Sequence, residues 1–513
     1  MSSTQPNVVF VLADQHHAGL MGCAGHEQVQ TPNLDAFAGS GMRFSNAYCQ
    51  NPICTPSRMS FFSGQYVHNH GYYGLSGPTP FGLDSMTRRF HDSGYRTGAW
   101  GKLHYPEHPR LWMSDDLDCC AHAYQTADGD RARGPFLRYL EGAGLRHLED
   151  SWHNTEEYGE RRIAHDARPS KLPYEHTMER WCVREALKFI DEGEDEPFFV
   201  HVALQRPHHP LLPTERFWDM YPADIELPPT VNLEPGGRPP HFRRMWENFH
   251  QDRGVFGGED DTFEDLARRV WRGTLACISQ IDDCFGRLMQ GLEERGLADD
   301  TIVVYGSDHG AYHSIHGIAE KAPGICSDAV CRIPMIWRVP GVTEDAETST
   351  EFLESVDVAP TLMSLCDLPP MESADGSDAA ALLRGDDVAI KDTAVTENAW
   401  SKAIRWGPWR MVHYQREMFD GEDVGELYNI EDDPWEKHNL YHDDDHQDVV
   451  VEGRRRLTEW LIRTTRVATS QPTVWSTGER LRGKRTYPIC SDGTAPNSAQ
   501  PRGRDKGGMI NYL

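Results

Sequence analysis

Short apolar runs recur along the chain, and each ends in a polar or glycine-rich turn. Their length and near-continuous hydrophobic character are typical of strands that are covered on both faces of a parallel sheet. The runs are 8–14, 96–102, 198–204, 301–308 and 333–339. Helical patterns lie between them, and the clearest covers 263–295, where apolar residues recur at three- and four-residue steps until Gly296 ends the pattern. Strands that alternate with helices predict an α/β sandwich around a mostly parallel central sheet.

Other helices are predicted to begin at Thr31-Pro32, near His176 and at Asp357, where proline or a capping residue precedes an apolar pattern. The proline-rich stretch 227–240 predicts an irregular surface loop.

The C-terminal region has a different pattern. A mostly polar stretch, 373–388, predicts a link, and it is followed by strand-like pieces at 405–414 and 425–428 and by a helix at 448–463. These elements predict a small antiparallel sheet with one helix on it. We therefore expect a large α/β domain at 1–385, a small α+β subdomain at 386–470 and a tail at 471–513. The tail has few apolar positions, which is typical of disorder or of a segment ordered against a partner subunit.

Composition excludes several classes of protein. With 38% hydrophobic and 25% charged residues, the 513-residue chain resembles a soluble globular protein, and no apolar run is long enough to span a bilayer. The first residues carry neither a basic region nor a cleavage site, so we expect a cytoplasmic protein without a membrane partner. For such a protein the twelve cysteines are expected to be free thiols, and no Cys pair has the spacing of a zinc site.

The net charge of −28 disfavours a nucleic-acid partner, because duplex binding needs a basic footprint. It also repels anionic substrates at long range, so a site for an anion must gather its own cations. Only nine residues are Lys, against forty-two Arg, and two of the nine, Lys102 and Lys321, lie in the segments singled out below.

Three predicted strands end in polar groups. Asp14-Gln15 follows the first strand, Lys102 and His104 follow the second, and Asp308-His309 follows another. The carboxyl ends of parallel strands meet at one edge of a sheet, so these groups can form an oxygen-rich cation site. A single Asp in such a place is more often a helix cap or a surface acid, but two strand-terminal Asp sets in one chain weaken that interpretation.

The segment Cys54-Thr-Pro-Ser-Arg58, followed by Ser63-Gly64, resembles the signature of the sulfatase family, in which a formylglycine-generating enzyme oxidises the cysteine. Other parts of the chain follow the family in order over about residues 5 to 465. They are Asn7 to Asp14, Thr31 to Asp35, Gly101-Lys102-Leu-His104, Pro207-His208-His209-Pro210, Gly306-Ser-Asp308-His309-Gly310 with Lys321, Pro334 to Gly341, and Glu426 to Pro434.

This resemblance implies an alkaline-phosphatase-like sandwich and a sulfuric ester hydrolase. It implies that Cys54 becomes 3-oxoalanine (formylglycine), whose hydrate attacks sulfur, and that a divalent metal polarises the sulfate. The metal is expected to be Ca²⁺, with Mn²⁺ or Mg²⁺ as alternatives. Its ligands by resemblance are Asp14, Gln15, residue 54, Asp308 and His309.

The resemblance also assigns catalytic roles. His104 is the candidate base, and His208 the candidate acid at the leaving oxygen, although His209 competes with it in the sequence. Lys102 and Lys321 bring positive charge to the sulfate, and Arg58 stabilises the formylglycine hydroxyl and the following helix. The remaining candidates are weaker: surface positions are expected for His313 and His316, and either pocket lining or plain packing for Tyr72, Tyr73, Trp112 and Trp152.

Asp14-Gln15 is more similar to the choline-sulfatase and phosphonate-monoester-hydrolase branches than to relatives with two acids there. Those branches place an Asn shortly after the signature helix, and only Asn69 lies nearby. Phosphonate monoester or phosphodiester hydrolysis is therefore the alternative activity, and manganese would suit it better than calcium. A catalytically silent binding protein is a third possibility, which the intact motif residues oppose. The expected partners are a small sulfate ester, whose alcohol part the sequence does not specify, and the formylglycine-generating enzyme. The chain is also expected to form a homodimer or a homotetramer.

Overall fold

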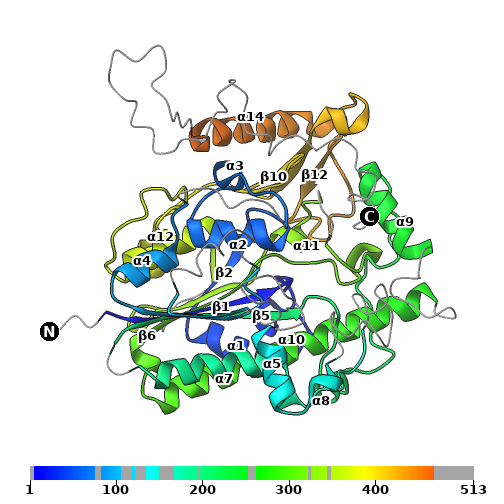
Figure 1. Ribbon diagram of the computed structural model, residues 1–513. Coiled ribbons are helices and arrows are strands. Elements are labelled where there is room, and N and C mark those ends of the chain that lie inside the picture. Colours follow the sequence, from blue (N-terminus) through cyan, green and yellow to red (C-terminus); the bar gives the residue numbers. More distant parts are fainter. Residues whose placement is uncertain are drawn as a thin grey trace, which may run out of the picture.

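Within the part of the chain that the structure describes, eight strands form the central sheet of the computed structural model, and β1 (Asn7–Asp14) lies in its middle (Figure 1). The order is β4-β3-β5-β1-β6-β7-β2-β8, and β7 alone runs antiparallel to its neighbours among these strands. The other strands are β2 (Met42–Tyr48), β3 (Arg96–Gly101), β4 (Cys119–His122), β5 (Phe198–Pro207), β6 (Thr301–Ser307), β7 (Met335–Arg338) and β8 (Ser349–Glu354).

The structure describes residues 5–75, 83–104, 117–122, 134–149, 167–193, 196–251, 262–321, 325–343 and 348–466. Trp112, Trp152 and the predicted tail 471–513 lie outside these ranges. None of the helices within them has both the length and the apolar character that a membrane crossing requires. Each cysteine in the described part is a free thiol, as predicted.

Side chains of β1 alternate between two cores. Val8, Phe10 and Leu12 face a layer of helices with Phe61 and Phe62. The intervening residues of β1 face a second layer and pack against residues of α7 and α10, among them Val183, Ile281 and Phe285. Every one of these side chains is buried, which explains the unbroken apolar run in the sequence. The predicted α/β sandwich is therefore confirmed.

The helices of the two layers lie on opposite faces of the sheet (Figure 1). One layer contains α2 (Cys54–Ser63), α4 (Met86–Asp92) and α12 (Val358–Leu365). The other contains α1 (Pro32–Gly39), α5 (Pro135–Gly142), α7 (Met178–Asp191), α8 (Glu215–Trp218) and α10 (Phe263–Glu294). Shorter or peripheral helices are α3 (Val67–His70), α9 (Pro240–Gln251), α11 (Asp328–Cys331) and α13 (Ala380–Leu383).

The longest helix, α10, matches its prediction closely. Thr262 and Asp265 form a capping box at its start, and each side chain accepts a hydrogen bond from the other residue's backbone N–H. Asp282 in the middle of α10 accepts hydrogen bonds from the backbone of Asn33 and Leu34 at the start of α1. These bonds fix α1 and α10 side by side below the central strands.

A second, antiparallel sheet has the order β12-β11-β10-β9. Its strands are β9 (Ala394–Glu397), β10 (Ser401–Trp406), β11 (Trp409–Tyr414) and β12 (Gly425–Asn429), and α14 (Gln447–Thr464) packs on it. The prediction of one strand at 405–414 was wrong. Gly407, with φ of 45°, and Pro408 form a turn there, because the glycine adopts a left-handed conformation and the proline has no N–H for a ladder. The predicted architecture of a small antiparallel sheet with a helix is confirmed.

Candidate active site

Four parallel strands end at the same edge of the central sheet. β1 ends at Asp14, β3 is followed by Lys102, β5 is followed by His208, and β6 is followed by Asp308. Since β1 lies between β5 and β6, groups from distant parts of the sequence meet there.

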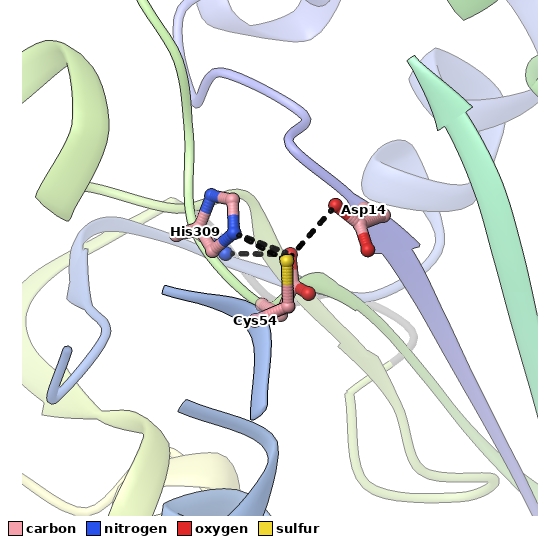
Figure 2. Close-up of side chains that lie close together, drawn as sticks. Asp14, Cys54 and His309 are labelled. Carbon is pink, nitrogen blue, oxygen red and sulfur yellow. Dashed lines mark hydrogen bonds and ion pairs between the residues drawn. The ribbon is translucent and has the colours of Figure 1, made fainter. Parts of the chain in front are cut away.

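Cys54 faces this edge from the first residue of α2 (Figure 2). All ten residues of α2 are buried, so the surrounding protein holds the Cys54 side chain in place. The Cys54 sulfur lies 3.3 Å from His309 Nε2, 3.6 Å from Lys321 Nζ and 3.7 Å from Asp14 Oδ1. The free N–H groups and positive dipole of the start of α2 add to the positive field around the sulfur.

Arg58 lies one turn further along α2 and joins the two acids. Its guanidinium donates to Asp308 Oδ2 at 2.9 Å, to Asp14 Oδ2 at 3.2 Å and to the Lys102 carbonyl at 2.6 Å. The side chains of all three charged residues are fully buried. Arg58 therefore bonds directly to the carboxylates, and its charge also interacts with that of the Cys54 side chain.

Two lysines complete the charge balance. The Lys102 ammonium lies 2.7 Å from Asp14 Oδ2, and the Lys321 ammonium donates to Gln15 Oε1 at 2.6 Å. Three cationic side chains thus surround two carboxylates and the Cys54 sulfur. The site concentrates positive charge locally, although the whole chain is strongly acidic.

Burial and charge act in opposite directions on these groups. Burial alone would raise the pKa of the Cys54 thiol, but the charges of Lys321, Lys102 and His309 hold that pKa well below its usual range. Burial would also raise the pKa of Asp14, and the neighbouring Lys102 lowers it instead. For Asp308, burial and the charge of Asp14 raise the pKa. Asp308 is thus the carboxylate that most needs another cation beside it.

The donor set fits a divalent cation. One ligand atom from each of Asp14, Cys54, Asp308 and His309 lies within 4.8 Å of the other three. His309 Nδ1 donates to the Gly310 carbonyl at 2.8 Å, which leaves the Nε2 lone pair directed at the group. Two carboxylates and one imidazole are a suitable set for a hard cation, and a positive charge between the two carboxylates would offset the burial and the repulsion that raise the pKa of Asp308.

The two candidate acid–base histidines also lie at residue 54. A hydrogen bond with His104 lowers the pKa of the Cys54 thiol, and His208 has a hydrogen bond with the same side chain. His208 Nδ1 donates to the His209 carbonyl at 2.7 Å, so its Nε2 is the atom able to exchange a proton. His209 points elsewhere: its Nδ1 lies 3.5 Å from Gln15 Nε2 and 3.4 Å from Glu320 Oε1. The geometry thus favours His208 over His209.

Two of the weaker expectations are corrected. His313 and His316 are not surface residues: both are buried, and His313 Nε2 donates to the Gln15 carbonyl at 2.9 Å. No local pattern in the sequence indicates this role, because the second partner of His313 is Thr274, on a helix that is distant in the sequence. Tyr72 is buried in the core beside α2, which supports packing as its role, while the Tyr73 hydroxyl donates to Glu397 Oε2 at 3.3 Å.

Asn69 is buried and holds the C-terminal helix. Its Nδ2 donates to Asp375 Oδ2 and to the Thr464 carbonyl, both at 2.8 Å. Its amide is therefore directed at α14 and the 373–388 stretch.

Comparison with known proteins agrees with the geometry. The family model described as Sulfatase matches residues 6–368, and the model described as N-sulphoglucosamine sulphohydrolase, C-terminal, matches 325–463. The chain is 27% identical to an uncharacterized sulfatase, YidJ, of Escherichia coli (89% of this chain, 87% of the relative), and 25% identical to a choline-sulfatase of Rhizobium meliloti (95% and 94%). The structure of a phosphonate monoester hydrolase from Agrobacterium radiobacter superposes with a TM-score of 0.74 at 20% identity, covering 90% of this chain and 96% of that one.

The family model alone covers more than two thirds of the chain, and it includes every residue that meets at the sheet edge. The chain therefore belongs to the sulfatase family of sulfuric ester hydrolases, within the alkaline phosphatase superfamily.

Proposed function

We propose that the protein hydrolyses a small sulfate monoester through a formylglycine made from Cys54 and a divalent cation, for which Ca²⁺ is the first candidate. The observation that carries this proposal is the position of Cys54. Its sulfur lies at the start of a buried helix, within 3.7 Å of an acid, an imidazole and an ammonium group. A tetrahedral anion next to residue 54 would meet positive charge from several directions.

Asp14, Asp308 and His309 would hold the cation, and Gln15 Oε1 can add to this set through its second lone pair. The cation supplies Lewis-acid polarisation of the sulfate oxygens. Arg58 keeps the two carboxylates in place whether or not the cation is bound, because it contacts an oxygen of each.

The remaining residues act on the substrate and on protons. A hydrated formylglycine at residue 54 would supply two hydroxyls, one to attack sulfur as the alcohol leaves and one to lose a proton as the aldehyde re-forms and sulfate departs. Lys102 and Lys321 neutralise the negative charge that collects on the sulfate oxygens. His208 Nε2 gives a proton to the departing alcohol oxygen, and His104 takes the proton from the second hydroxyl.

His208 has a consequence for the free protein. Burial, and then the charge of Lys102, lower its pKa, so His208 is neutral at neutral pH before substrate binds. A bound sulfate ester brings negative charge beside Lys102 and Lys321 and thereby favours the protonated imidazole. Protonation of His208 is thus coupled to the arrival of the anion.

Hydrolysis of a phosphonate monoester or phosphodiester is the alternative for the same site. Gln15, not a second acid, follows Asp14, so the cation site has one carboxylate fewer than in relatives with two acids there. A phosphonate monoester, a phosphodiester and a sulfate monoester are all tetrahedral anions with one negative charge, so the same cations can hold each of them.

The test begins with the mass of tryptic peptide 44–58, from protein produced together with a formylglycine-generating enzyme. Conversion replaces one sulfur and two hydrogens by one oxygen, a loss of about 18 Da. The same peptide contains Cys49, which is buried and serves as an internal control. Fragmentation should place the loss at residue 54 and leave Cys49 unchanged.

In the same preparation, hydrolysis of an aryl sulfate is compared with hydrolysis of an aryl phosphonate, with Cys54→Ala as the blank. Faster sulfate turnover supports the proposal, and faster phosphonate turnover moves the protein to the alternative. Full activity from a preparation in which residue 54 remains a thiol would contradict the formylglycine mechanism.

A further inference from the structure

Gln15 has an unusual backbone conformation at the centre of the site. It is fully buried and its φ is 71°, in the left-handed region that side chains other than glycine rarely adopt. Such a conformation persists only where the surroundings impose it. The residues that impose it on Gln15 are therefore of functional interest.

Each polar group of Gln15 has a partner. Its N–H donates to Asp308 Oδ1 at 3.2 Å, and its carbonyl accepts from His313 Nε2 at 2.9 Å. Its side-chain Oε1 accepts from Lys321 Nζ at 2.6 Å, and its Nε2 donates to His209 Nδ1 at 3.5 Å. The orientation of the amide is thus fixed: oxygen toward the lysine, nitrogen toward the histidine.

His313 is fixed in turn by the longest helix. A carbonyl can only accept, so His313 Nε2 carries the hydrogen, and Nδ1 is left to accept from the Thr274 hydroxyl at 3.2 Å. His313 is fully buried and its own φ is 49°, while its N–H donates to the Ala319 carbonyl at 3.1 Å. Thr274 lies on α10, so the chain of contacts runs from a rigid helix to the Gln15 backbone.

We propose that His313 is a positioning residue, which holds Gln15 in its left-handed conformation so that the Gln15 carboxamide places the Lys321 ammonium beside residue 54. Lys321 Nζ then lies 3.6 Å from the Cys54 sulfur, where the charge of a transferring sulfate develops. This positioning role goes beyond the proposed function, and its activity test rests on that function. His313 acts on residue 54 only through Gln15 and Lys321, which distinguishes it from the catalytic residues.

Two substitutions separate the hydrogen bond from the bulk of the side chain. His313→Leu removes both hydrogen bonds, whereas His313→Gln keeps an N–H donor at a similar reach. The matched control is His201→Leu, because His201 is also fully buried and its Nδ1 donates to a backbone carbonyl of another element, that of Phe10 on β1, at 3.0 Å. Within the described part of the chain, the contacts of His201 are with Phe10 and Phe62 and not with Gln15, so His201→Leu should affect stability alone.

We expect His313→Leu to lower kcat by about 10- to 100-fold. KM should rise by a smaller factor than kcat falls, because Lys321 meets the negative charge of the bound ester as well as that of the transition state. His313→Gln should recover most of kcat, and His201→Leu should lower the Tm but keep kcat. The effect should be equal for aryl sulfate and aryl phosphonate, since either anion needs Lys321. A kcat of His313→Leu equal to that of His201→Leu would overturn the proposal.

Thr274→Val provides a second route, because it removes the hydroxyl that fixes His313 but keeps the shape of the side chain. Its effect on kcat should be smaller and should vanish in the His313→Leu background, as expected for residues in one chain of contacts. Additive losses in the double variant would contradict a shared pathway through His313.

A crystal structure of His313→Leu tests the inference even if the wild type hydrolyses neither ester. Gln15 should leave the left-handed region, and the contact between Lys321 Nζ and Gln15 Oε1 should lengthen beyond hydrogen-bond distance. If both stay as in the wild type, the positioning role is wrong, whatever the protein hydrolyses.

Discussion

Arg58 shows how a single side chain prepares a cation site. Its planar guanidinium reaches an oxygen of Asp14, an oxygen of Asp308 and the Lys102 carbonyl at once. A lysine could not satisfy this fork, since its ammonium is a compact point charge. Inside the fold, His309 and Arg58 are the groups that oppose the rise in the pKa of Asp308, and Arg58 bonds to its carboxylate.

Removing this counterion should destabilise the cation-free protein. For Arg58→Ala in EDTA we expect a loss of about 3 to 5 kcal/mol in the free energy of unfolding, because two buried carboxylates remain without it. Saturating Ca²⁺ should restore part of the loss, since the ion neutralises the same oxygens. Urea unfolding with and without Ca²⁺ measures both quantities.

The control for this measurement is Arg332→Ala. Arg332 donates to Asp328 at 2.7 Å. Neither residue belongs to the group that could hold a cation, and the Arg332 side chain is partly exposed, so its smaller loss should not depend on Ca²⁺. A deficit of Arg58→Ala that is the same in EDTA and in Ca²⁺ would argue against a cation between Asp14 and Asp308.

At this scale the sequence predicted positions better than contacts. Strand ends identified Asp14, Lys102 and Asp308, because parallel strands bring their carboxyl ends together regardless of their separation in the chain. The roles of Arg58 and His313 could not be predicted in this way. Each depends on a side-chain direction and on a partner in another element, which no local pattern encodes.

Gly101 ends strand β3 immediately before Lys102. Its φ is 114°, and a Cβ at this position would come within 2.0 Å of the Ala203 carbonyl oxygen on the neighbouring strand. Strand β5 passes this close because the Lys102 N–H donates to the same carbonyl at 2.9 Å. The close approach of these two strands therefore sets where the Lys102 and His104 side chains leave the sheet.

Gly101→Ala should be strongly destabilising, and Gly94→Ala is its matched control. Gly94 also has a positive φ, 85°, but a Cβ there would contact nothing within 4 Å. Backbone strain alone should cost Gly94→Ala about 1 to 3 kcal/mol. Gly101→Ala should lose about 2 kcal/mol more through the steric clash. Equal losses in thermal unfolding would show that strand β5 moves away without penalty.

Among the elements, those with strong periodicity were predicted and those with mixed surfaces were not. β2 was missed because Arg43, Ser45 and Asn46 interrupt its apolar pattern. The side chains of Ser45 and Asn46 donate hydrogen bonds to backbone carbonyls of the neighbouring strand β8. The apolar pattern is equally weak in β9, which begins at Ala394, and in the edge strands β4 and β8. Pairing with neighbouring strands determines whether such segments form strands, whereas the composition of the buried strands β1, β5 and β6 is itself sufficient to predict them.

The small sheet is tied to the signature segment through Glu397. Its backbone pairs with Gln50 and Asn51, and its carboxylate accepts from the His68 backbone at 2.9 Å and lies 2.5 Å from Lys402 Nζ. Burial would raise the pKa of Glu397, but Lys402 and His68 lower it to about 2. The small sheet thus supports the loop that leads into Cys54.

A carboxylate with a lowered pKa stabilises the folded state above the unfolded-state value and loses this contribution as the pH falls. For Glu397 the loss should extend from about pH 4.5 down to about 2 and amount to about 3 kcal/mol. In Glu397→Gln this part of the pH dependence should be absent, which urea unfolding between pH 2 and 6 would reveal. An unchanged pH dependence in the variant would show that other acids account for the acid sensitivity.

The net charge of −28 concerns the molecule as a whole. At low ionic strength its field extends about 30 Å from the surface and opposes the approach of an anion, and at 0.15 M salt it extends about 8 Å. We therefore expect kcat/KM for an anionic aryl sulfate to rise about two- to fivefold over this range. A zwitterionic sulfate ester of zero net charge should show little change. A fall for the aryl sulfate would mean that the cations of the site dominate even at long range.

The burial of Cys54 has a consequence for the order of events during synthesis. The groups that close around it, Asp308, Lys321 and the strand that contains Glu397, leave the ribosome long after Cys54 does. At about 5 to 20 residues per second, the roughly 340 residues between Cys54 and Glu397 take about 20 to 70 s to be made. During that interval a modifying enzyme can reach the thiol on a nascent chain. Once the later strands have added to the sheet, the same thiol is enclosed, and the opportunity to convert it has passed.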